Sequence, residues 1–356
     1  MAPAGGYAWG YRLAARYHHQ NRRLGLTPSA RSIAPHQDSR FPFALPFRFV
    51  GFTEIEEVID MRVLVTGATG LIGGAVAHRL KEGGHEIVGL ARSEASAAKL
   101  LDRGFVAEKG ELADPVSLAS AVRGVDAVVH AASPNDQNAA SLDEIATRAI
   151  LEAQRGTGKR FIYTSGSLVY GSTGDTAATE DTPLNPVEMV RWRQALEREI
   201  LAAGAEGVHP VVIRPAWVYG NWGGAAMMMV AAAKEHGAAL HVGDGQNRWS
   251  TVHADDLADL YALALERAPA GSVFNGAHGS APRLVEIARA ASELGGAGGR
   301  VAAWPLDEAR KVLWGFADAI ASDQIISGEK AKRELGWNPS RASIIDELRA
   351  YALAVA

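Results

Sequence analysis

The chain has 356 residues, of which 47% are hydrophobic and 21% are charged, and its formal net charge is −4 at pH 7. This is an ordinary globular composition, and the slightly acidic balance without a basic stripe argues against nucleic-acid binding. No apolar run reaches about 18 residues, so we expect no membrane span. The absence of cysteine excludes disulfides, thiolate catalysis and zinc–thiolate sites.

The first 60 residues differ from the rest of the chain. Residues 1–50 carry seven arginines but a single acidic residue, Asp38. An arginine-rich, acid-poor leader resembles an organellar transit segment, which predicts a mitochondrial or plastid protein. The alternatives are a disordered tail, or upstream sequence that is not naturally translated, with Met61 as the true start. The low serine content and the strand pattern that begins at Met61 favour these alternatives, and with them a cytoplasmic protein.

A predicted strand at 62–66 runs directly into a glycine-spaced turn and a helix near 71–83. Gly67 can adopt turn dihedrals that a side chain forbids, Gly70 lets the backbone approach a phosphate, and Gly73 lets the helix pack closely on the strand. The N–H groups and the dipole at the helix start then favour a dinucleotide pyrophosphate. The predicted cofactor-binding residues of this turn are Thr66, Gly67, Thr69, Gly70, Leu71, Ile72 and Gly73.

Strand and helix patterns alternate along the chain after this motif. Further strands are predicted at 85–91, 105–108, 126–132, 160–165 and 209–215. Helices are predicted near 93–102, after the N-cap and N1 pair Asp114-Pro115, near 141–155 and over 188–203. This alternation predicts an α/β architecture, a doubly wound parallel-sheet Rossmann fold.

Beyond residue 220 the periodicity becomes mixed. We predict an NAD(P)-binding Rossmann domain over 61–220 and a smaller C-terminal substrate cap over 221–356, with elements that return to the core. The segments 222–245, 271–305 and 320–340 are interpreted as short strands, helices and loops of this cap, and 291–300 as a loop. Such a cap would pack over the carboxyl ends of the sheet, where ligands bind in these folds.

Six motifs occur in order over residues 61–345. They are TGATGLIGG at 66–74, VVHAAS at 128–133, YTSGSLVYG at 163–171, VIRPAWVYG at 212–220, NRWSTVHADDLADLYALAL at 247–265 and GEKAKRELGWNP at 328–339. In these motifs the chain resembles the extended short-chain dehydrogenase/reductase family, also called the NAD-dependent epimerase/dehydratase family. It resembles more closely an atypical subgroup in which the catalytic signature is altered.

The end of the second predicted strand bears on the choice of cofactor. NAD-specific proteins place Asp or Glu there to accept from the ribose 2′-hydroxyl, whereas here Arg92 and Ser93 follow the strand. A guanidinium can bind a phosphate with two N–H groups, and a hydroxyl can donate beside it, which favours NADP(H). In the alternative, Arg92 is a solvated surface residue and Glu94 turns inward to the ribose, which leaves NAD possible.

The resemblance implies further contacts with the cofactor. In the family the tip of the fourth strand lies along the cofactor, an acidic–apolar pair flanks the adenine, and the end of the sixth strand approaches the nicotinamide. The matching positions in this sequence are Ala131, Ala132 and Ser133, then Leu112 after Glu111, and Pro215 to Val218. In the alternative, these residues at the strand ends only pack within the fold and do not contact the cofactor.

The catalytic signature of the family is altered in this chain. The family uses Ser/Thr with Tyr-x-x-x-Lys, where the tyrosine is the acid/base and the lysine lowers its pKa and orients the ribose. No tyrosine here is followed by lysine four residues later. Matched to the family's motifs, the serine, tyrosine and lysine positions are occupied by Gly166, Met189 and Arg193.

Four residues are candidates for a replacement chemistry. Ser165, Ser167 and Tyr170 are the nearest protic groups on the strand tip, although the resemblance gives this tyrosine a structural role as the alternative. Arg193 could hold a ribose hydroxyl but could not act as a proton donor.

The presumed cap offers candidates for substrate binding. By the resemblance, Arg248 and Trp249 belong to a loop that in relatives contacts the substrate, often a sugar-nucleotide diphosphate, and Tyr219 stands behind the catalytic candidates. A salt bridge is the alternative for Arg248. Three methionines and five tryptophans either line an apolar substrate cavity or fill the core, namely Met227–Met229, Trp217, Trp222, Trp304, Trp314 and Trp337.

His253, Asp255 and Asp256 look like a catalytic His/Asp pair. In the family, however, V-H-x-D-D begins a helix, so we expect capping and a tie between the two lobes. The histidines are otherwise scattered and no carboxylate cluster appears, so no metal site is predicted.

Three functions fit these observations. The first is an NADP(H)-dependent oxidoreductase of a small carbonyl or alcohol substrate, with a non-standard proton donor. The second is a catalytically silent NADP(H) sensor or partner-binding protein, and the third, disfavoured by the missing Tyr/Lys pair, is a sugar-nucleotide epimerase or dehydratase. By analogy with the family, a homodimer would form through the helices near 141–155 and 188–203.

Overall fold

Seven parallel strands form the main sheet of the structure, a computed structural model that describes residues 61–134 and 136–355. In spatial order they are β11 (Ser272–Gly276), β6 (His209–Pro215), β5 (Arg160–Thr164), β4 (Ala127–His130), β1 (Arg62–Thr66), β2 (Glu86–Ala91) and β3 (Val106–Lys109). The strand order reverses between β1 and β4, which is the switch point where such folds bind ligands. The predicted doubly wound Rossmann fold is confirmed.

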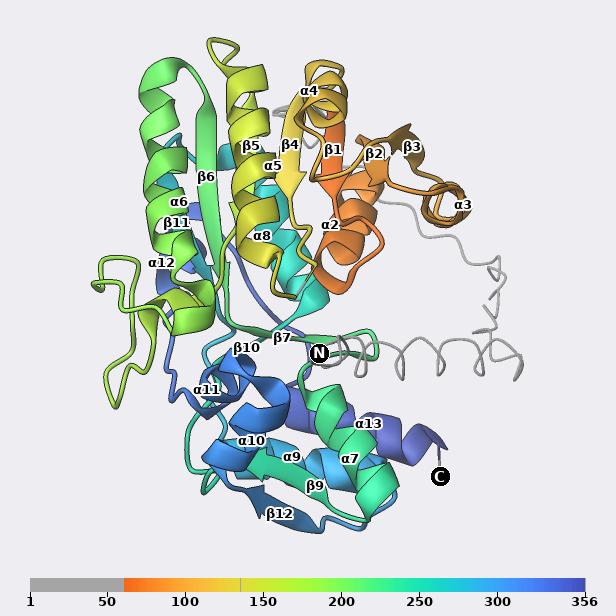
Figure 1. Ribbon diagram of the computed structural model, residues 1–356, viewed down its shortest axis with the longest axis vertical. Helices are drawn as coiled ribbons and strands as arrows, with labels where there is room; N and C mark the ends of the chain where they lie inside the picture. The colour runs from red at the N-terminus through yellow and green to blue at the C-terminus, as the bar shows by residue number, and fades with distance from the viewer. Residues whose placement is uncertain (1–60, 135, 356) are drawn as a thin grey trace, which may run out of the picture.

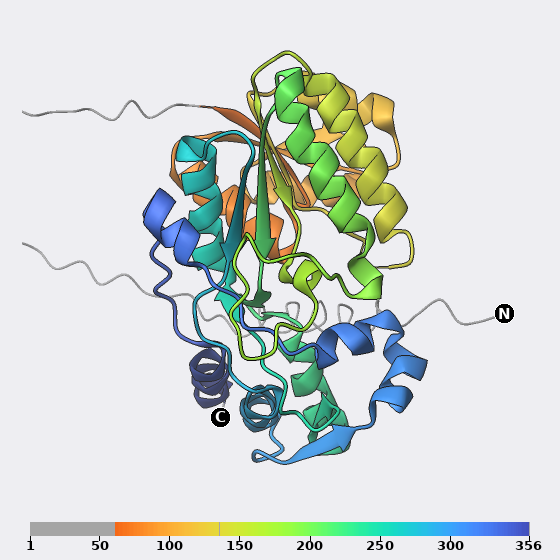
Figure 2. The same cartoon turned by 90° about the vertical axis from the view of Figure 1, so that its left-hand side faces the viewer.

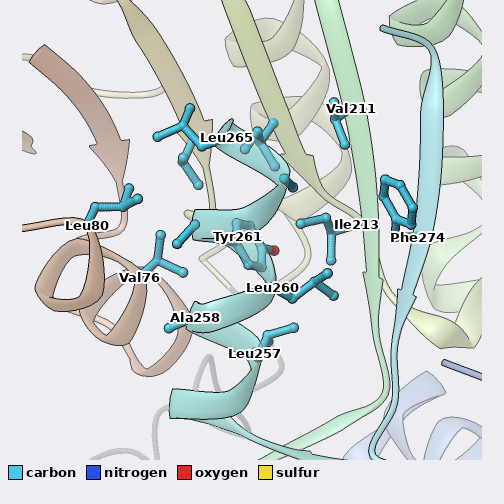
Figure 3. Close-up of a cluster of buried hydrophobic side chains, with 14 of the residues drawn as sticks. Val76, Leu80, Val211, Ile213, Leu257, Ala258, Leu260, Tyr261, Leu265 and Phe274 are labelled. Atoms are coloured by element: carbon cyan, nitrogen blue, oxygen red, sulfur yellow. The ribbon is translucent and has the colours of Figure 1, made fainter. Parts of the chain in front are cut away.

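Helices cover both faces of this sheet, because alternate strand residues point to opposite sides. On one face lie α2 (Leu71–Glu82), α3 (Glu94–Asp102), α8 (Ala254–Arg267) and α12 (Glu329–Leu335). On the other lie α4 (Pro115–Arg123), α5 (Ala139–Gln154) and α6 (Trp192–Ala202). Val63 and Val65 of β1 pack into the first layer and Leu64 into the second. Figure 3 shows α8 in the first layer, with Leu260 beside Ile213 of β6.

A second lobe lies below the carboxyl ends of these strands (Figure 1). Its core is made by the helices α7 (Ala226–His236), α9 (Leu284–Leu294), α10 (Leu306–Leu313), α11 (Gly315–Ala321) and α13 (Ile344–Val355), with the strand pair β9 (Ala239–Val242) and β12 (Val301–Trp304). The chain passes between the lobes through a three-stranded sheet of β10 (Thr251–His253), β7 (Trp217–Gly220) and β8 (Gly223–Gly224).

The structure corrects three interpretations of the sequence. The segment 271–305, assigned to the cap, begins with β11, which pairs with β6 at the edge of the main sheet. The supposed loop 291–300 starts inside α9, whose buried residues Leu284, Ile287, Ala288, Ala291 and Leu294 follow helical spacing. The long helix over 188–203 is divided into a 3₁₀ turn, η2 (Glu188–Val190), and α6.

Within the part of the chain that the structure describes, every helix falls short of the length and hydrophobicity needed to cross a bilayer. The predictions for residues 1–60 concern a segment outside the described residues.

Candidate active site

The glycine turn between β1 and α2 has the geometry of a phosphate cradle. Gly67 has φ +73°, and a Cβ there would lie 2.9 Å from the Ala132 Cα. The Gly70 N–H donates to the Gly67 carbonyl over 2.8 Å and closes the turn. A Cβ on Gly73 would lie only 2.4 Å from the same carbonyl oxygen, so the helix can approach the turn only with glycine here. Gly70 is the N-cap of α2, and no side chain caps this helix end, which leaves its N–H groups for an anion.

Thr66 joins the cradle to the tip of β4. Its Oγ1 accepts from the N–H groups of Ala131 and Ala132 at 3.1 and 3.2 Å. With both lone pairs used, its proton must go to His130 Nδ1, 2.7 Å away. The neighbours along the predicted cofactor path are open to solvent: Thr69, Gly70 and Ser133 are exposed, and Leu71, Ile72, Ala131, Ala132, Leu112 and Val218 are half-buried.

The edge of the cradle at the end of β2 carries positive charge. Arg92 is exposed and has no hydrogen bond or ion pair to any other described residue. Ser93 caps α3 in a reciprocal pair with Ser96, and Glu94 is the exposed first residue of that helix. A second guanidinium, that of Arg103, donates to the Ala68 carbonyl within the glycine turn over 2.9 Å. Two guanidinium groups, those of Arg92 and Arg103, therefore lie at this edge of the turn.

Two of the three altered positions of the catalytic signature, Gly166 and Arg193, lie beside each other. Arg193 donates to the Ser165 carbonyl at the tip of β5, and its guanidinium lies 5.5 Å from the Trp192 ring. A Cβ on Gly166 would lie 3.0 Å from Arg193 Nη1. The guanidinium therefore occupies space beside position 166, which explains why arginine and glycine occur here together.

Two buried polar atoms at this tip have no hydrogen-bond partner among the described residues. They are Ser165 Oγ and Arg193 Nε. Ser165 follows Phe161 and Tyr163 on the face of β5 that α6 covers, so its hydroxyl points to the same side as Arg193. Buried polar groups are rarely left unpaired, so this corner is prepared for a polar ligand group.

The other two catalytic candidates are engaged within the fold. Tyr170 donates to Asn275 Oδ1 over 2.8 Å and accepts from Arg214 Nη1 over 2.7 Å. Burial raises the pKa of Tyr170 against the opposing effect of Arg214. Ser167 donates to Gln324 Oε1 over 2.9 Å. Both hydroxyls already donate to partners within the fold, which leaves neither of them to donate to a substrate.

A buried ion pair fixes the helix that carries Arg193. Glu197 of α6 accepts from the Nε and Nη2 atoms of Arg214 on β6, and the two residues are 2% and 5% exposed. The pair ties α6 to the strand that leads to Pro215, at the expected nicotinamide end.

A second buried network was missed from the sequence. Asp143 of α5 accepts from His130 Nε2 at 3.2 Å, from Tyr163 Oη at 2.6 Å and from Trp192 Nε1 at 3.0 Å. Burial acts to raise the pKa of Asp143, but His130, the charge of Arg193 and the hydrogen bond from Tyr163 outweigh it, and the pKa is lowered. The network runs from Thr66 through His130 and Asp143 to Trp192, which directly precedes Arg193 in α6. The signal that the sequence offered for this network was a polar ring in each of two otherwise apolar strands, His130 and Tyr163.

The three residues predicted to bind substrate make contacts inside the protein. Arg248 forms ion pairs with Asp323 and Asp175 at 2.6 and 2.9 Å. Trp249 is 1% exposed and donates to the Ile320 carbonyl, and the Tyr219 hydroxyl donates to the Ala342 carbonyl over 2.6 Å. These contacts hold the second lobe together.

His253 caps the start of α8, and Asp256 connects that helix to the segment before α13. Capping and such a connection are what the family resemblance implied for this motif. His253 Nδ1 accepts the Asp255 N–H at the start of α8. Asp256 accepts from the N–H groups of Ser340 and Arg341 at 3.0 and 3.1 Å. His253 Nε2 also lies 3.1 Å from Glu347 of α13.

The His253–Glu347 contact should make stability depend on pH. Burial acts to lower the pKa of His253, but Glu347, with smaller effects of Asp255 and Asp256, raises it above its ordinary value. The stabilisation from this contact should be fully present below about pH 6.5, the pKa of the histidine in the unfolded chain. It should be lost as the pH rises through the higher pKa of His253 in the folded protein. Urea unfolding of wild type and Glu347→Gln should give a difference that shrinks toward alkaline pH; a constant difference would contradict this assignment.

Comparison with known proteins settles the family. The model of the NAD dependent epimerase/dehydratase family matches residues 63–277. The chain belongs to this family. The uncharacterized protein C2A9.02 of Schizosaccharomyces pombe is 34% identical over 304 residues, which are 82% of this chain and 99% of that protein. The 2-alkyl-3-oxoalkanoate reductase of Stenotrophomonas maltophilia is 28% identical and covers 61% of this chain and 68% of its own length.

Among solved structures the chain is similar to a dTDP-glucose 4,6-dehydratase of Streptomyces venezuelae with NAD bound. The TM-score is 0.70 at 25% identity, over 82% of this chain and 96% of that one. Members of the family include reductases, epimerases and dehydratases, and neighbours bind NAD, which supports an NAD(P) cofactor at the cradle.

Proposed function

We propose that this protein is an NADP(H)-dependent reductase of carbonyl compounds that works without the tyrosine–lysine pair. The observation that carries the proposal is the juxtaposition of Arg193 with Ser165 at the tip of β5, next to a cradle built for a dinucleotide. When bound, the cofactor supplies the hydride. A similar protein is a reductase by its printed name, which agrees with this reaction class.

Arg193 and Ser165 at the β5 tip have different roles in the proposed reduction. The Arg193 guanidinium places positive charge where a carbonyl oxygen becomes negative as it takes up hydride, and such preorganised charge is a large source of rate enhancement. Arginine stays protonated, so it stabilises charge and does not transfer the proton. Ser165 Oγ is a hydroxyl beside it that has no partner among the described residues, and it donates a hydrogen bond to the developing alkoxide, while the proton that completes the alcohol is taken up from solvent.

The cradle residues have separate tasks in the proposal. The N–H groups at Gly70–Gly73 hold the pyrophosphate, and Arg92 with Arg103 holds the 2′-phosphate. Thr66 keeps the tips of β1 and β4 together, so that Ala131 to Ser133 line the path of the cofactor. Pro215 to Val218 lie at the nicotinamide end.

A test of cofactor choice uses Arg92→Ala. Loss of a charge-assisted contact should weaken NADPH binding by about 1.5–3 kcal/mol, roughly 10- to 100-fold. NADH, which lacks the 2′-phosphate, should bind as in wild type. Calorimetric titration of both cofactors measures this. Unchanged NADPH affinity, with weakened NADH binding in Glu94→Gln, would assign the site to NAD.

A silent NADP(H) sensor is the second candidate, because the Tyr-x-x-x-Lys pair is missing. Its signature is tight cofactor binding without consumption of NADPH on aldehydes, ketones or imines. A sugar-nucleotide epimerase or dehydratase is disfavoured, because Arg248, the expected diphosphate ligand, is neutralised by two carboxylates.

A further inference from the structure

Asp143 is a buried carboxylate that accepts hydrogen bonds from neutral groups. Thr66 Oγ1 accepts from two N–H groups and donates to His130 Nδ1, so the pattern assigns the ring hydrogen to Nε2 and makes His130 neutral. The three donors to the carboxylate are therefore the neutral ring of His130, the Tyr163 hydroxyl and the Trp192 indole N–H. Within the described part of the chain, no lysine or arginine forms an ion pair with Asp143. The negative charge thus lies inside the fold without a cation in contact.

Arg193 is a positive charge in the corresponding situation. Its guanidinium donates to the Ser165 carbonyl, and no carboxylate among the described residues forms an ion pair with it. Glu197, one turn further along α6, is held by Arg214. Helices α5 and α6, yellow and green in Figure 2, run side by side on one face of the main sheet. An anion and a cation without direct ion partners therefore lie on neighbouring helices.

The Trp192 indole connects these two charges. Its Nε1 donates to Asp143 Oδ2 over 3.0 Å, and the Arg193 guanidinium carbon lies 5.5 Å from the centre of the same ring. A cation within about 6 Å of an indole face is attracted to it. The hydrogen bond to a carboxylate fixes the indole and polarises it in the sense that strengthens this attraction. Burial acts to raise the pKa of Asp143, whereas its contacts with His130 and the positive charge of Arg193 lower it, so the two charges stabilise each other.

We infer that Asp143 is a positioning residue for the reduction, which holds the Arg193 guanidinium at the tip of β5 through the Trp192 indole. A carboxylate in direct contact with the guanidinium would neutralise the charge that a developing alkoxide needs. With the indole between them, the carboxylate orients the guanidinium and leaves its N–H groups free of an ion pair. The inference rests on the proposed function for the reaction, whereas the coupling of the two charges is a property of the folded protein and needs no turnover.

The test is a double-mutant cycle of Asp143→Asn and Arg193→Met, measured on the whole protein as kcat for reduction of benzaldehyde by NADPH. Asp143→Asn keeps the shape of the side chain and removes its charge. It should lower kcat about tenfold in the wild-type background but less than about twofold in Arg193→Met, because residues that act as a unit are not additive. NADPH affinity should change far less than kcat, because the pyrophosphate is held by the N–H groups of the glycine turn.

The same four proteins are compared by urea unfolding at pH 7, which requires no turnover. Because the two charges stabilise each other, the double variant should lose less stability than the sum of the single variants, by about 3- to 10-fold in the equilibrium constant for unfolding. Trp192→Leu is the second variant, and it decides the test if Asp143→Asn does not fold. It removes the indole from a half-buried position and should likewise lower kcat in the wild-type background and hardly at all in Arg193→Met.

Glu144→Gln is the matched control, because Glu144 is the neighbouring carboxylate of α5 and pairs with Arg148 on the surface. It should leave kcat unchanged and its effect on stability should add to that of Arg193→Met. Equal losses of kcat in both backgrounds, or additive losses of stability from Asp143→Asn and Arg193→Met, would overturn the inference and leave the reductase intact. Coupled stability without reduction of any aldehyde would keep the link between the two charges and refute the proposed function.

Discussion

Gly73→Ala is expected to weaken binding of both NADPH and NADH by about 10- to 100-fold. The added Cβ would lie 2.4 Å from the Gly67 carbonyl oxygen and 2.7 Å from the Gly67 carbonyl carbon, so the turn must move away from the helix. Overpacking of this kind costs roughly 1–3 kcal/mol, and each 1.4 kcal/mol is about tenfold in affinity. Since this backbone holds the pyrophosphate, both cofactors should be affected alike. Calorimetric titration with each cofactor measures the change.

The neighbouring Gly74→Ala variant is the control for this prediction. A Cβ on Gly74 would lie 3.0 Å from Arg103 Nη1, which can shift, and 3.4 Å from the Ala68 carbonyl oxygen, which is ordinary contact. Because Arg103 is proposed to hold the 2′-phosphate, the control applies to NADH, which lacks this group. Alanine is also the better helix former, so the variant should fold at least as well as wild type. Equal affinities of the two variants for NADH would refute the assignment of the turn as the cofactor cradle.

Glu197→Ala is expected to lower the free energy of unfolding by about 3–5 kcal/mol, because it leaves the Arg214 guanidinium buried without its counter-charge. Arg214 is 5% exposed, so water cannot replace the carboxylate. The loss should also release α6 from β6 and lower turnover through the displacement of Arg193. Urea unfolding followed by circular dichroism gives the stability.

Glu199→Ala on the same helix is the matched control. Glu199 pairs with Arg148 on the surface, with side chains 40% and 57% exposed, so its removal should cost at most about 1 kcal/mol. A similar small loss in Glu197→Ala would mean that the buried pair contributes little to the position of α6.

The fold and the cradle followed from the sequence because their signals are local. The spacing of Gly67, Gly70 and Gly73 lies within eight residues and constrains one turn. The strands alternate with helices so regularly that β1 and β6 were located to the residue. The assignment of Arg193 to the family's lysine position rests on its distance from Glu197 in the sequence and stays a prediction.

The tertiary contacts around the site could not be predicted from the sequence in this way. Met189 lies beside Gly315, and Trp217 meets Phe316 edge-on. The members of each pair lie far apart in the chain and are brought together only by the second lobe. The two alternatives for Arg248, substrate binding and a salt bridge, could not be separated from the sequence for the same reason, since its partner Asp323 follows 75 residues later. Residue types alone did not separate Ser165, which is unpaired, from Ser167, which is bound to Gln324.

The central claim is that the Ser165–Arg193 corner reduces a carbonyl in the absence of the usual tyrosine and lysine. It is tested most directly by NADPH oxidation and alcohol formation, measured together for wild type, Arg193→Met and Arg193→Lys on an aldehyde panel that includes benzaldehyde. We expect stoichiometric turnover by wild type and a loss of about 100-fold or more in kcat for Arg193→Met. Arg193→Lys should restore part of this loss, and NADPH affinity should be lowered far less. Tight NADPH binding by wild type with no alcohol formed from any member of the panel would contradict it.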